Sequence, residues 1–300
     1  MPERDQWAEW LAERRYGGDP ERAARGLEQL VQWRDRVLDH ARLAEGETVL
    51  DVGCGEGLVG FGALERGAGT VIFSDVSQDL LDFCREAATE LSVLRRSRFL
   101  RAPAHDLQPV DSSSVDVVAT RSVLIYVEDK ESTFREFARV LRPGGRISLF
   151  EPINRFARTT ADTWAGFDLS PIRDISEKLR AIYEAIQPPD TDPMLDFDER
   201  DLVDLAERAG FFPIRLDLEA EIRASDHLSW ENFLASAGNP RNSDGCRSHG
   251  PGAHPRGAGA PYRSSPPARR GRSRHSANGP RFPPRRQALK TEVDWSAAAR

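Results

Sequence analysis

Apolar residues between positions 45 and 220 recur in two alternating patterns, which predict strands and helices in turn. Short apolar runs predict the strands, and longer stretches with apolar residues every three or four positions predict the helices between them. The predicted strands are 48–52, 71–75, 98–101, 115–119, 146–150 and 211–218, and the predicted helices are 57–66, 78–91, 130–141 and 198–209. This alternation predicts an α/β fold with a mostly parallel, doubly wound sheet and helices on both of its faces.

The chain before residue 45 predicts a helical extension of this core. Apolar and aromatic residues keep helical spacing from Trp7 to Arg14, and Asp5 stands where it can cap that helix. Asp19-Pro20 is a second N-cap with proline in the first turn, and an amphipathic stripe follows it to Arg42. The pattern divides the chain into 1–44 (helical cap), 45–151 (core), 152–192 (mainly helical insertion), 193–240 (end of the core) and 241–300 (tail).

The insertion of residues 152–192 follows the strand predicted at 146–150. It is therefore expected over the mouth of a crevice at the carboxyl ends of the strands. Trp164 and Phe167 are candidates for the wall of a substrate pocket there, although packing of the insertion onto the core explains them equally well. We expect this insertion to supply most of the substrate selectivity.

Three alternating glycines follow the first predicted strand, in the stretch Val49-Leu50-Asp51-Val52-Gly53-Cys54-Gly55-Glu56-Gly57. Such glycines let the backbone turn tightly and approach a ligand, because no Cβ stands in the way. The next predicted strand ends in Asp75, whose carboxylate can accept both hydroxyls of a ribose. Together the two features predict a site for a cofactor that contains a nucleoside.

Two registers of these glycines compete. Gly55, Gly57 and Gly60 fit the G-x-G-x-x-G spacing of a dinucleotide site, which would indicate an NAD-dependent oxidoreductase. That register leaves Gly53 unexplained, whereas G-x-G-x-G from Gly53 begins where the strand ends and places Asp51 inside the strand. A carboxylate near the loop suits a ligand with an ammonium group, so the second register is preferred.

The second register resembles the first motif of the class I S-adenosylmethionine-dependent methyltransferases. The resemblance covers residues 45–220: Ala102–Leu124 is similar to that superfamily's adenine-edge loop and fourth strand, and Arg142-Pro143-Gly144-Gly145 to the turn before its fifth strand. It implies a Rossmann-like methyltransferase fold and methyl transfer from S-adenosyl-L-methionine. The superfamily ends with an antiparallel strand beside the fifth, and residues 241–300 offer no candidate for it, so this final strand is expected to be missing.

The resemblance also implies a cofactor site. Asp51 is expected to orient the methionine amino group, and Asp75 to bind the ribose. The full expected set is Asp51, Gly53, Cys54, Gly55, Gly57, Asp75, Val76, Ala104, His105 and Arg121. Many relatives carry an acid where this chain has Pro103, which offers neither a backbone donor nor a side-chain acceptor. Adenine recognition then falls to the Ala104 amide and to His105 or Asp106.

No motif identifies a catalytic base, because alignment of nucleophile, methyl group and sulfur supplies much of the rate of such a displacement. His105, Tyr126 and Glu151 are the candidates for a base or a substrate-orienting group. Histidine is the side-chain type that exchanges protons near neutral pH, which makes His105 a candidate. Tyr126 follows the fourth predicted strand, and Glu151 ends the fifth strand facing the crevice. Each also has a structural explanation: contact with adenine, burial with a satisfied hydroxyl, and a turn at Pro152.

Charge separates the core from the tail. Residues 241–300 hold thirteen basic and three acidic residues, whereas residues 1–240 hold 29 basic and 45 acidic residues. The acidic core lacks the basic footprint of a nucleic-acid-binding domain, so a small-molecule substrate is expected instead. Cys54, Cys84 and Cys246 lack metal-ligand spacing, which predicts no metal site and a reducing, cytoplasmic setting. No membrane span is expected, because no run reaches about 20 apolar residues.

The tail allows two interpretations. From Arg241 to Arg286 there is no Leu, Ile or Val, so the tail is expected to be disordered. As a genuine basic arm it would bind nucleic acid or an acidic partner, and the chain would be a cofactor- or RNA-binding protein. Alternatively, a slip of the reading frame near Asn239 replaces the normal end of the core. The abrupt change in composition between Pro240 and Asp244 favours this second interpretation.

Overall fold

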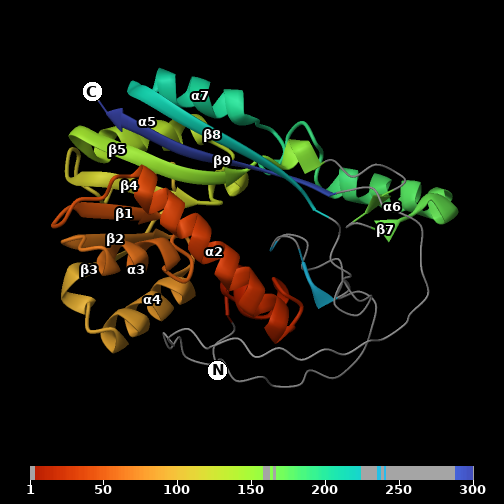
Figure 1. Ribbon diagram of the computed structural model, residues 1–300, viewed down its shortest axis with the longest axis horizontal. Helices are drawn as coiled ribbons and strands as arrows, with labels where there is room; N and C mark the ends of the chain where they lie inside the picture. Colours follow the sequence, from red (N-terminus) through yellow and green to blue (C-terminus); the bar gives the residue numbers. More distant parts are fainter. Residues whose placement is uncertain are drawn as a thin grey trace, which may run out of the picture.

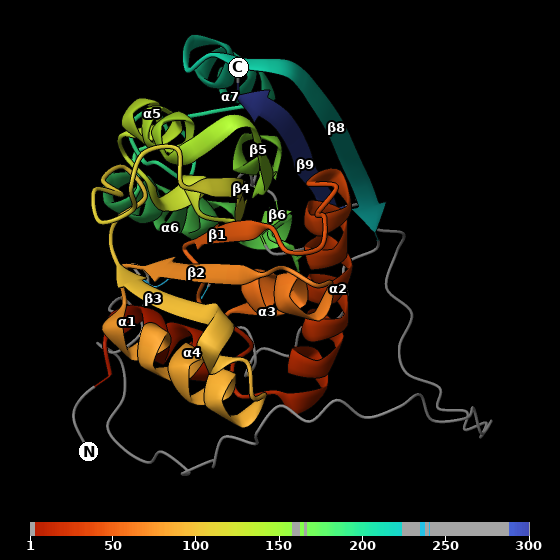
Figure 2. The same ribbon diagram turned by 90° about the vertical axis from the view of Figure 1, so that its left-hand side faces the viewer.

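The computed structural model describes residues 4–157, 163–164, 167–223, 235–237, 240 and 288–299. Its centre is a seven-stranded sheet in the order β3-β2-β1-β4-β5-β9-β8, which Figure 2 shows from β3 at the bottom to β8 at the top. The strands are β1 (Thr48–Val52), β2 (Thr70–Asp75), β3 (Ser97–Arg101), β4 (Val115–Arg121), β5 (Leu141–Pro152), β8 (Phe211–Arg223) and β9 (Ala288–Ala299). Neighbours among β1–β5 are parallel, and β9 is antiparallel to both β5 and β8.

Helices cover both faces of this sheet, as the sequence predicts for a doubly wound, Rossmann-like fold (Figure 1). One face is covered by α2 (Pro20–His40), α3 (Leu58–Glu65) and α4 (Gln78–Glu90), and the other by α5 (Lys130–Val140) and α7 (Glu199–Arg208). The described part of the insertion contains the short strands β6 (Thr163–Trp164) and β7 (Phe167–Asp168) and helix α6 (Arg173–Ile186). In Figure 1, α6 lies well away from the sheet.

The period of two along β1 and β2 sends their side chains into two separate hydrophobic layers. Leu50 and Val52 pack with the α5 and α7 side of the core, whereas Val49 and Phe73 pack with the α2–α4 side. A Cβ on Gly60 of α3 would lie 2.3 Å from the Phe73 ring, so this helix reaches the sheet only with glycine there. Packing against Phe73 therefore accounts for Gly60.

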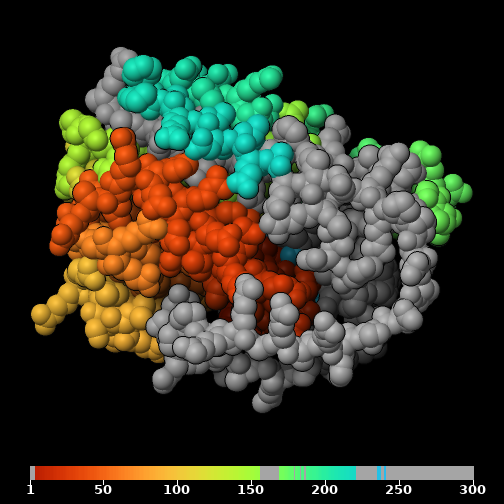
Figure 3. Space-filling view, viewed as in Figure 1, coloured from red at the N-terminus to blue at the C-terminus, as the bar shows by residue number. Residues whose placement is uncertain are grey.

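The N-terminal extension is fastened to the start of α4. It begins with α1 (Gln6–Glu9), which Asp5 caps as expected, and continues as a π-helical turn, η1 (Trp10–Arg14). The Asp5 amide donates to Asp79 Oδ2 at 2.7 Å, and the Ser77 hydroxyl donates to Asp5 Oδ2 at 2.6 Å. In the space-filling view, the red N-terminal residues cover the middle of the face that is shown (Figure 3). The extension thus lies next to the carboxyl end of β2.

The expectation that the final antiparallel strand is absent is wrong. Residues 288–299 form β9, which pairs from Arg146↔Ala298 to Pro152↔Glu292 with β5 and along most of β8. The signal is present in the sequence, because Leu289, Thr291, Val293 and Trp295 alternate with Lys290, Glu292 and Asp294. This alternation follows a long segment without Leu, Ile or Val, so the composition of residues 241–300 as a whole does not reveal it.

The rest of the predicted tail, residues 241–287, lies outside the described residues. A frame slip near Asn239 stays a hypothesis for that segment alone. It does not extend to residues 288–299, whose pattern and pairing are those of a strand of the core.

Candidate functional site

A cavity of about 930 Å³ opens at the carboxyl ends of the parallel strands. The register brings these ends level, because Val52 of β1 stands opposite Ser74 of β2 and Thr120 of β4. The volume of the cavity is at the upper end of the ~300–1,000 Å³ range of ligand pockets. The cavity is therefore large enough for two small molecules to lie side by side.

The glycine loop presents backbone to this cavity. Gly53, Gly55 and Gly57 have φ angles of +61°, +53° and +80°, which side chains disfavour. A Cβ on Gly53 would lie 2.4 Å from a methyl carbon of Val123, whereas a Cβ on Gly55 would meet only Leu11, at 3.7 Å. Gly53 and Gly55 line the cavity, so the loop forms a cradle into which a Cβ on Gly55 would project.

Asp75 lies beside this cradle with its carboxylate held in place. Oδ2 accepts the Gly55 amide at 2.9 Å, and Oδ1 accepts the Ser77 amide at 2.9 Å. Each oxygen keeps accepting capacity for a hydroxyl of a ligand, and the side chain lines the cavity. Burial raises the pKa of Asp75, although these amides oppose the shift. Beyond it, Val76, Pro103, Ala104 and His105 line the expected adenine end of the cavity.

Three residues of the expected cofactor set, Asp51, Cys54 and Gly57, do not line the cavity. Asp51 is 2% exposed and accepts the Gly60 amide at 2.8 Å from beneath the loop. Burial raises the pKa of Asp51 to about 7, although the Gly60 amide and the charge of Arg121 lower it. The thiols of Cys54 and Cys84 both donate to the Gly55 carbonyl, so they support the shape of the loop.

The three candidates for a catalytic group lie in different places. His105 is exposed at the adenine end of the cavity. Tyr126 belongs to η3 (Leu124–Tyr126), lines the cavity, and packs edge-to-face on Trp7 with ring centroids 4.9 Å apart. Of these three candidates, Tyr126 is the one that lines the cavity and also follows β4 in the chain.

Glu151 does not face the crevice, contrary to our expectation. Phe150 lines the cavity, so the alternation of β5 turns Glu151 away from it. Glu151 is fully buried, and its oxygens accept the amides of Val123, Leu124 and Ile125 at 2.8, 3.0 and 3.4 Å. Burial raises its pKa to about 7, against the effect of these amides. Glu151 thus shapes the turn that carries Tyr126.

Aromatic side chains that the sequence analysis did not assign to the site form much of the cavity wall. Trp33 of α2 stacks on Phe150 of β5 with ring centroids 4.8 Å apart, and Trp7 and Trp10 come from the extension. The helical stripes that contain these residues are visible in the sequence, but a stripe does not specify what it covers. The extension and α2 therefore close the cavity over β4 and β5.

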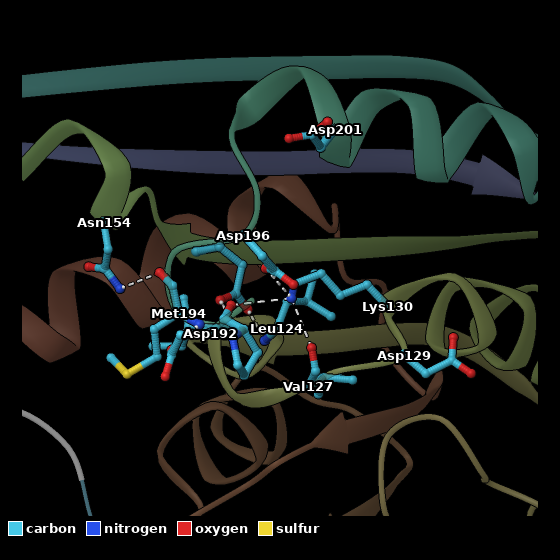
Figure 4. A network of polar contacts seen from close by, with 12 residues as sticks. Leu124, Val127, Asp129, Lys130, Asn154, Asp192, Met194, Asp196 and Asp201 are labelled. Carbon is cyan, nitrogen blue, oxygen red and sulfur yellow. Dashed lines mark hydrogen bonds and ion pairs between the residues drawn. The ribbon is translucent and has the colours of Figure 1, made fainter. Parts of the chain in front are cut away.

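The start of the insertion reaches the wall of the cavity. Of its described residues, Pro152, Ile153 and Asn154 line the cavity, and the side chains of Trp164 and Phe167 lie outside the described part. A polar network holds the wall nearby (Figure 4). Buried Lys130 donates to the Val127 and Pro193 carbonyls and to Asp196 at 2.7 Å, and Asn154 donates to the Met194 carbonyl. Val127 and Met194 both line the cavity.

Within the described ranges, no group of three or more His, Cys, Asp or Glu side chains is arranged to hold a metal ion. The same part of the chain contains no helix that is long and apolar enough to cross a membrane.

Comparison with known sequences supports the interpretation of the glycine loop. The Methyltransferase domain family matches residues 50–149, which run from β1 to β5. The ubiquinone/menaquinone biosynthesis C-methyltransferase UbiE of Idiomarina loihiensis is 25% identical over 189 residues, which cover 60% of this chain and 72% of that protein. The enzyme of the same name from Citrobacter koseri is 31% identical over 121 residues, or 40% of this chain and 48% of its own length. The chain thus spans about half of that second relative.

Solved structures show the same fold. Geranyl diphosphate C-methyltransferase from Streptomyces coelicolor A3(2), solved with S-adenosyl-L-homocysteine, superposes with a TM-score of 0.53 and 17% identity. The superposition covers 96% of this chain and 85% of that one. These similarities give no support to the dinucleotide register of the glycines.

Proposed function

We propose that this chain is a class I S-adenosylmethionine-dependent methyltransferase that methylates a small, largely apolar molecule inside its cavity. One observation carries the proposal. A single cavity joins the glycine cradle and Asp75 to the aromatic wall of Trp33, Phe150 and Tyr126. A cofactor on the cradle and an acceptor against the wall would therefore be neighbours.

The residues at the cradle fit S-adenosylmethionine. Asp75 is the ribose ligand in this proposal, the backbone of Gly53 and Gly55 lies along the methionine part, and Val76, Ala104 and His105 border the adenine. The bound cofactor supplies an activated methyl group on a sulfonium. The contribution of the chain is to hold both reactants in line and to keep water out, which is worth several kcal/mol in such reactions.

Asp51 supports the methionine ammonium group from beneath the loop in this proposal, which predicts a pH dependence. The ionised carboxylate binds the ammonium group best, and the pKa of Asp51 is about 7 in the absence of ligand. The affinity for S-adenosylhomocysteine should therefore rise about tenfold from pH 6 to pH 8 and then level off. Calorimetric titrations across this range test it, with Asp51→Asn as the control. An equally steep rise in Asp51→Asn would contradict the role.

Tyr126 is the orienting or proton-accepting group for the acceptor in this proposal, because it lies after β4 on the acceptor side. Tyr126→Phe should lower the rate of methyl transfer roughly 10²-fold, the lower end for general acid–base catalysis, and leave the affinity for S-adenosylhomocysteine unchanged. His105→Gln, at the adenine end, should instead change cofactor affinity. Wild-type turnover in Tyr126→Phe would clear this residue of the role.

The acceptor class is tested by following a labelled methyl group. The full-length chain is incubated with methyl-labelled S-adenosylmethionine and a bacterial extract that has been divided by dialysis. We expect the label in the dialysable fraction. Label in protein or nucleic acid would overturn the small-molecule proposal and favour an interaction of the basic tail with macromolecules.

The names of the relatives support a small acceptor, because one methylates geranyl diphosphate and another acts in quinone biosynthesis. We place the protein in the cytoplasm within the same proposal. The two described cysteines, Cys54 and Cys84, are free and buried, which suits a reducing compartment.

A further inference from the structure

Two guanidinium groups line the cavity together with the glycine cradle and the aromatic wall. Arg121 ends β4 one residue after Thr120, which stands opposite Val52, so it lies level with Gly53. Arg15 follows η1, and its Cζ lies 5.3 Å from the centre of the Tyr16 ring and 5.6 Å from that of the Trp10 ring. Both arginines line the cavity.

The two charges are close enough to oppose each other. Burial lowers the pKa of Arg121 to about 10, and the positive charge of Arg15 contributes to this shift. Arg121 makes one long hydrogen bond, from Nη1 to Ser122 Oγ at 3.4 Å. Among the described residues, neither guanidinium has a carboxylate within ion-pair distance. An arginine has five N–H donors, so most of this donor capacity remains available.

The nearest carboxylates do not neutralise this pair. Asp51 and Glu151 act on Arg121 through space, but their oxygens are engaged by backbone amides. Because burial raises the pKa of both carboxyls to about 7, each carries only part of a negative charge at neutral pH. Glu56 acts through space on both arginines, and burial raises the pKa of its carboxyl. Within the described part of the chain, both guanidinium groups therefore stand in a partly dry environment without a direct carboxylate partner, and an unpaired charge is costly there.

The sequence places Arg121 in the expected cofactor set, but the cofactor cannot pair with both arginines. S-adenosylmethionine has a sulfonium and an ammonium group but a single carboxylate, so its binding adds positive charge. A negatively charged group on the second molecule in the cavity would balance the two arginines. The planar guanidinium matches the geometry of a carboxylate or a phosphate and can donate two parallel hydrogen bonds to it.

We propose that Arg15 and Arg121 bind an anionic group, a carboxylate or a phosphate, on the methyl acceptor. This inference rests on the proposed function and names the class of its substrate. The acceptor has an aromatic or hydrocarbon body, which packs against Trp33 and Phe150, and an anionic end, which lies between the arginines. The arginines thereby select against neutral molecules of the same shape.

The test is a set of calorimetric titrations of the full-length chain saturated with S-adenosylhomocysteine. The probes are benzoate, phenyl phosphate and the neutral benzamide. We expect at least one anionic probe to bind at least tenfold more tightly than benzamide. Arg121→Gln and Arg15→Gln should each weaken that binding about tenfold or more, as expected for a charge-assisted hydrogen bond. Arg135→Gln, which alters an exposed pair with Glu131 on α5, should change nothing.

Several results would overturn the inference. Equal binding of benzamide and both anions would show that charge is not recognised, and binding of neither anion would show that no anion site exists. Arg121→Gln is also titrated with S-adenosylhomocysteine and with methylthioadenosine, which lacks the amino-acid part. Loss of affinity for the first ligand alone would assign the arginine to the cofactor's carboxylate instead.

Failure of the proposed function itself has a different signature. In that case the wild-type chain would not bind S-adenosylhomocysteine. The anionic probes, titrated without it, would still show whether Arg15 and Arg121 bind an anion. Arg15→Gln, at a half-buried position in the extension, keeps the test decisive if Arg121→Gln does not fold.

Discussion

Asp75→Asn is expected to weaken the affinity for S-adenosylhomocysteine about 100-fold. The carboxylate both receives the ribose hydroxyls in our proposal and accepts the Gly55 amide that shapes the cradle. The loss of charge-assisted hydrogen bonds worth ~1.5–3 kcal/mol corresponds to a decrease in affinity of roughly 10- to 100-fold, and we expect the upper end. The measurement is a calorimetric titration of a variant whose unfolding curve shows that it is folded.

A second ligand separates ribose binding from damage to the loop. An analogue of S-adenosylhomocysteine that lacks one ribose hydroxyl should bind the wild-type chain more weakly than S-adenosylhomocysteine does. Its affinity should fall little further when Asp75→Asn is introduced. Asp82→Asn, an exposed change on α4, is the matched control and should leave the affinity unchanged. Undiminished affinity in a folded Asp75→Asn variant would remove the ribose assignment.

Glu151→Ala is expected to lower the free energy of unfolding by about 3–5 kcal/mol. The change leaves the amides of Val123, Leu124 and Ile125 without their acceptor in a buried turn, at ~1–3 kcal/mol for each unsatisfied group. Urea unfolding of the purified chain measures the loss. Glu131→Ala on the exposed face of α5 should cost less than about 0.5 kcal/mol. A similarly small loss in Glu151→Ala would mean that the turn finds other partners.

Much of the core can be predicted from the sequence because its elements are marked locally. The strand that ends at Val52, the glycines that follow and the acid at the end of β2 lie within one βαβ unit, and the structure places them at one edge. Parallel strands bring their carboxyl ends together, so the neighbourhood of Gly53, Asp75 and Arg121 follows from the order of the elements.

The orientation of Glu151 could not be predicted with the same certainty. The sequence places it at the end of β5, where both faces of the strand are covered, and its apolar neighbours do not reveal which face meets the cavity. The stacking of Phe150 on Trp33 of α2 shows which face of β5 meets the cavity, and Glu151 lies on the opposite face. A long-range contact between an extension and the sheet decides that orientation.

The remaining differences also arise from contacts that are distant along the chain. Trp33 lies on a visible helical stripe of the predicted helical cap, but the sequence does not show which residues of this cap line the cavity. β9 is separated from β8 by more than sixty residues, and its pairing partners cannot be read from its own alternation. A period-two pattern near the C-terminus is nevertheless a usable signal, even after a long polar segment.

The central claim is that the cradle of Gly53, Gly55 and Asp75 binds S-adenosylmethionine. Calorimetric titration of the purified full-length chain with S-adenosylhomocysteine, with NAD as the control ligand, tests it most directly. The account predicts micromolar binding of S-adenosylhomocysteine and no binding of NAD. A cooperatively folded chain that binds NAD, or that binds neither ligand, would contradict it.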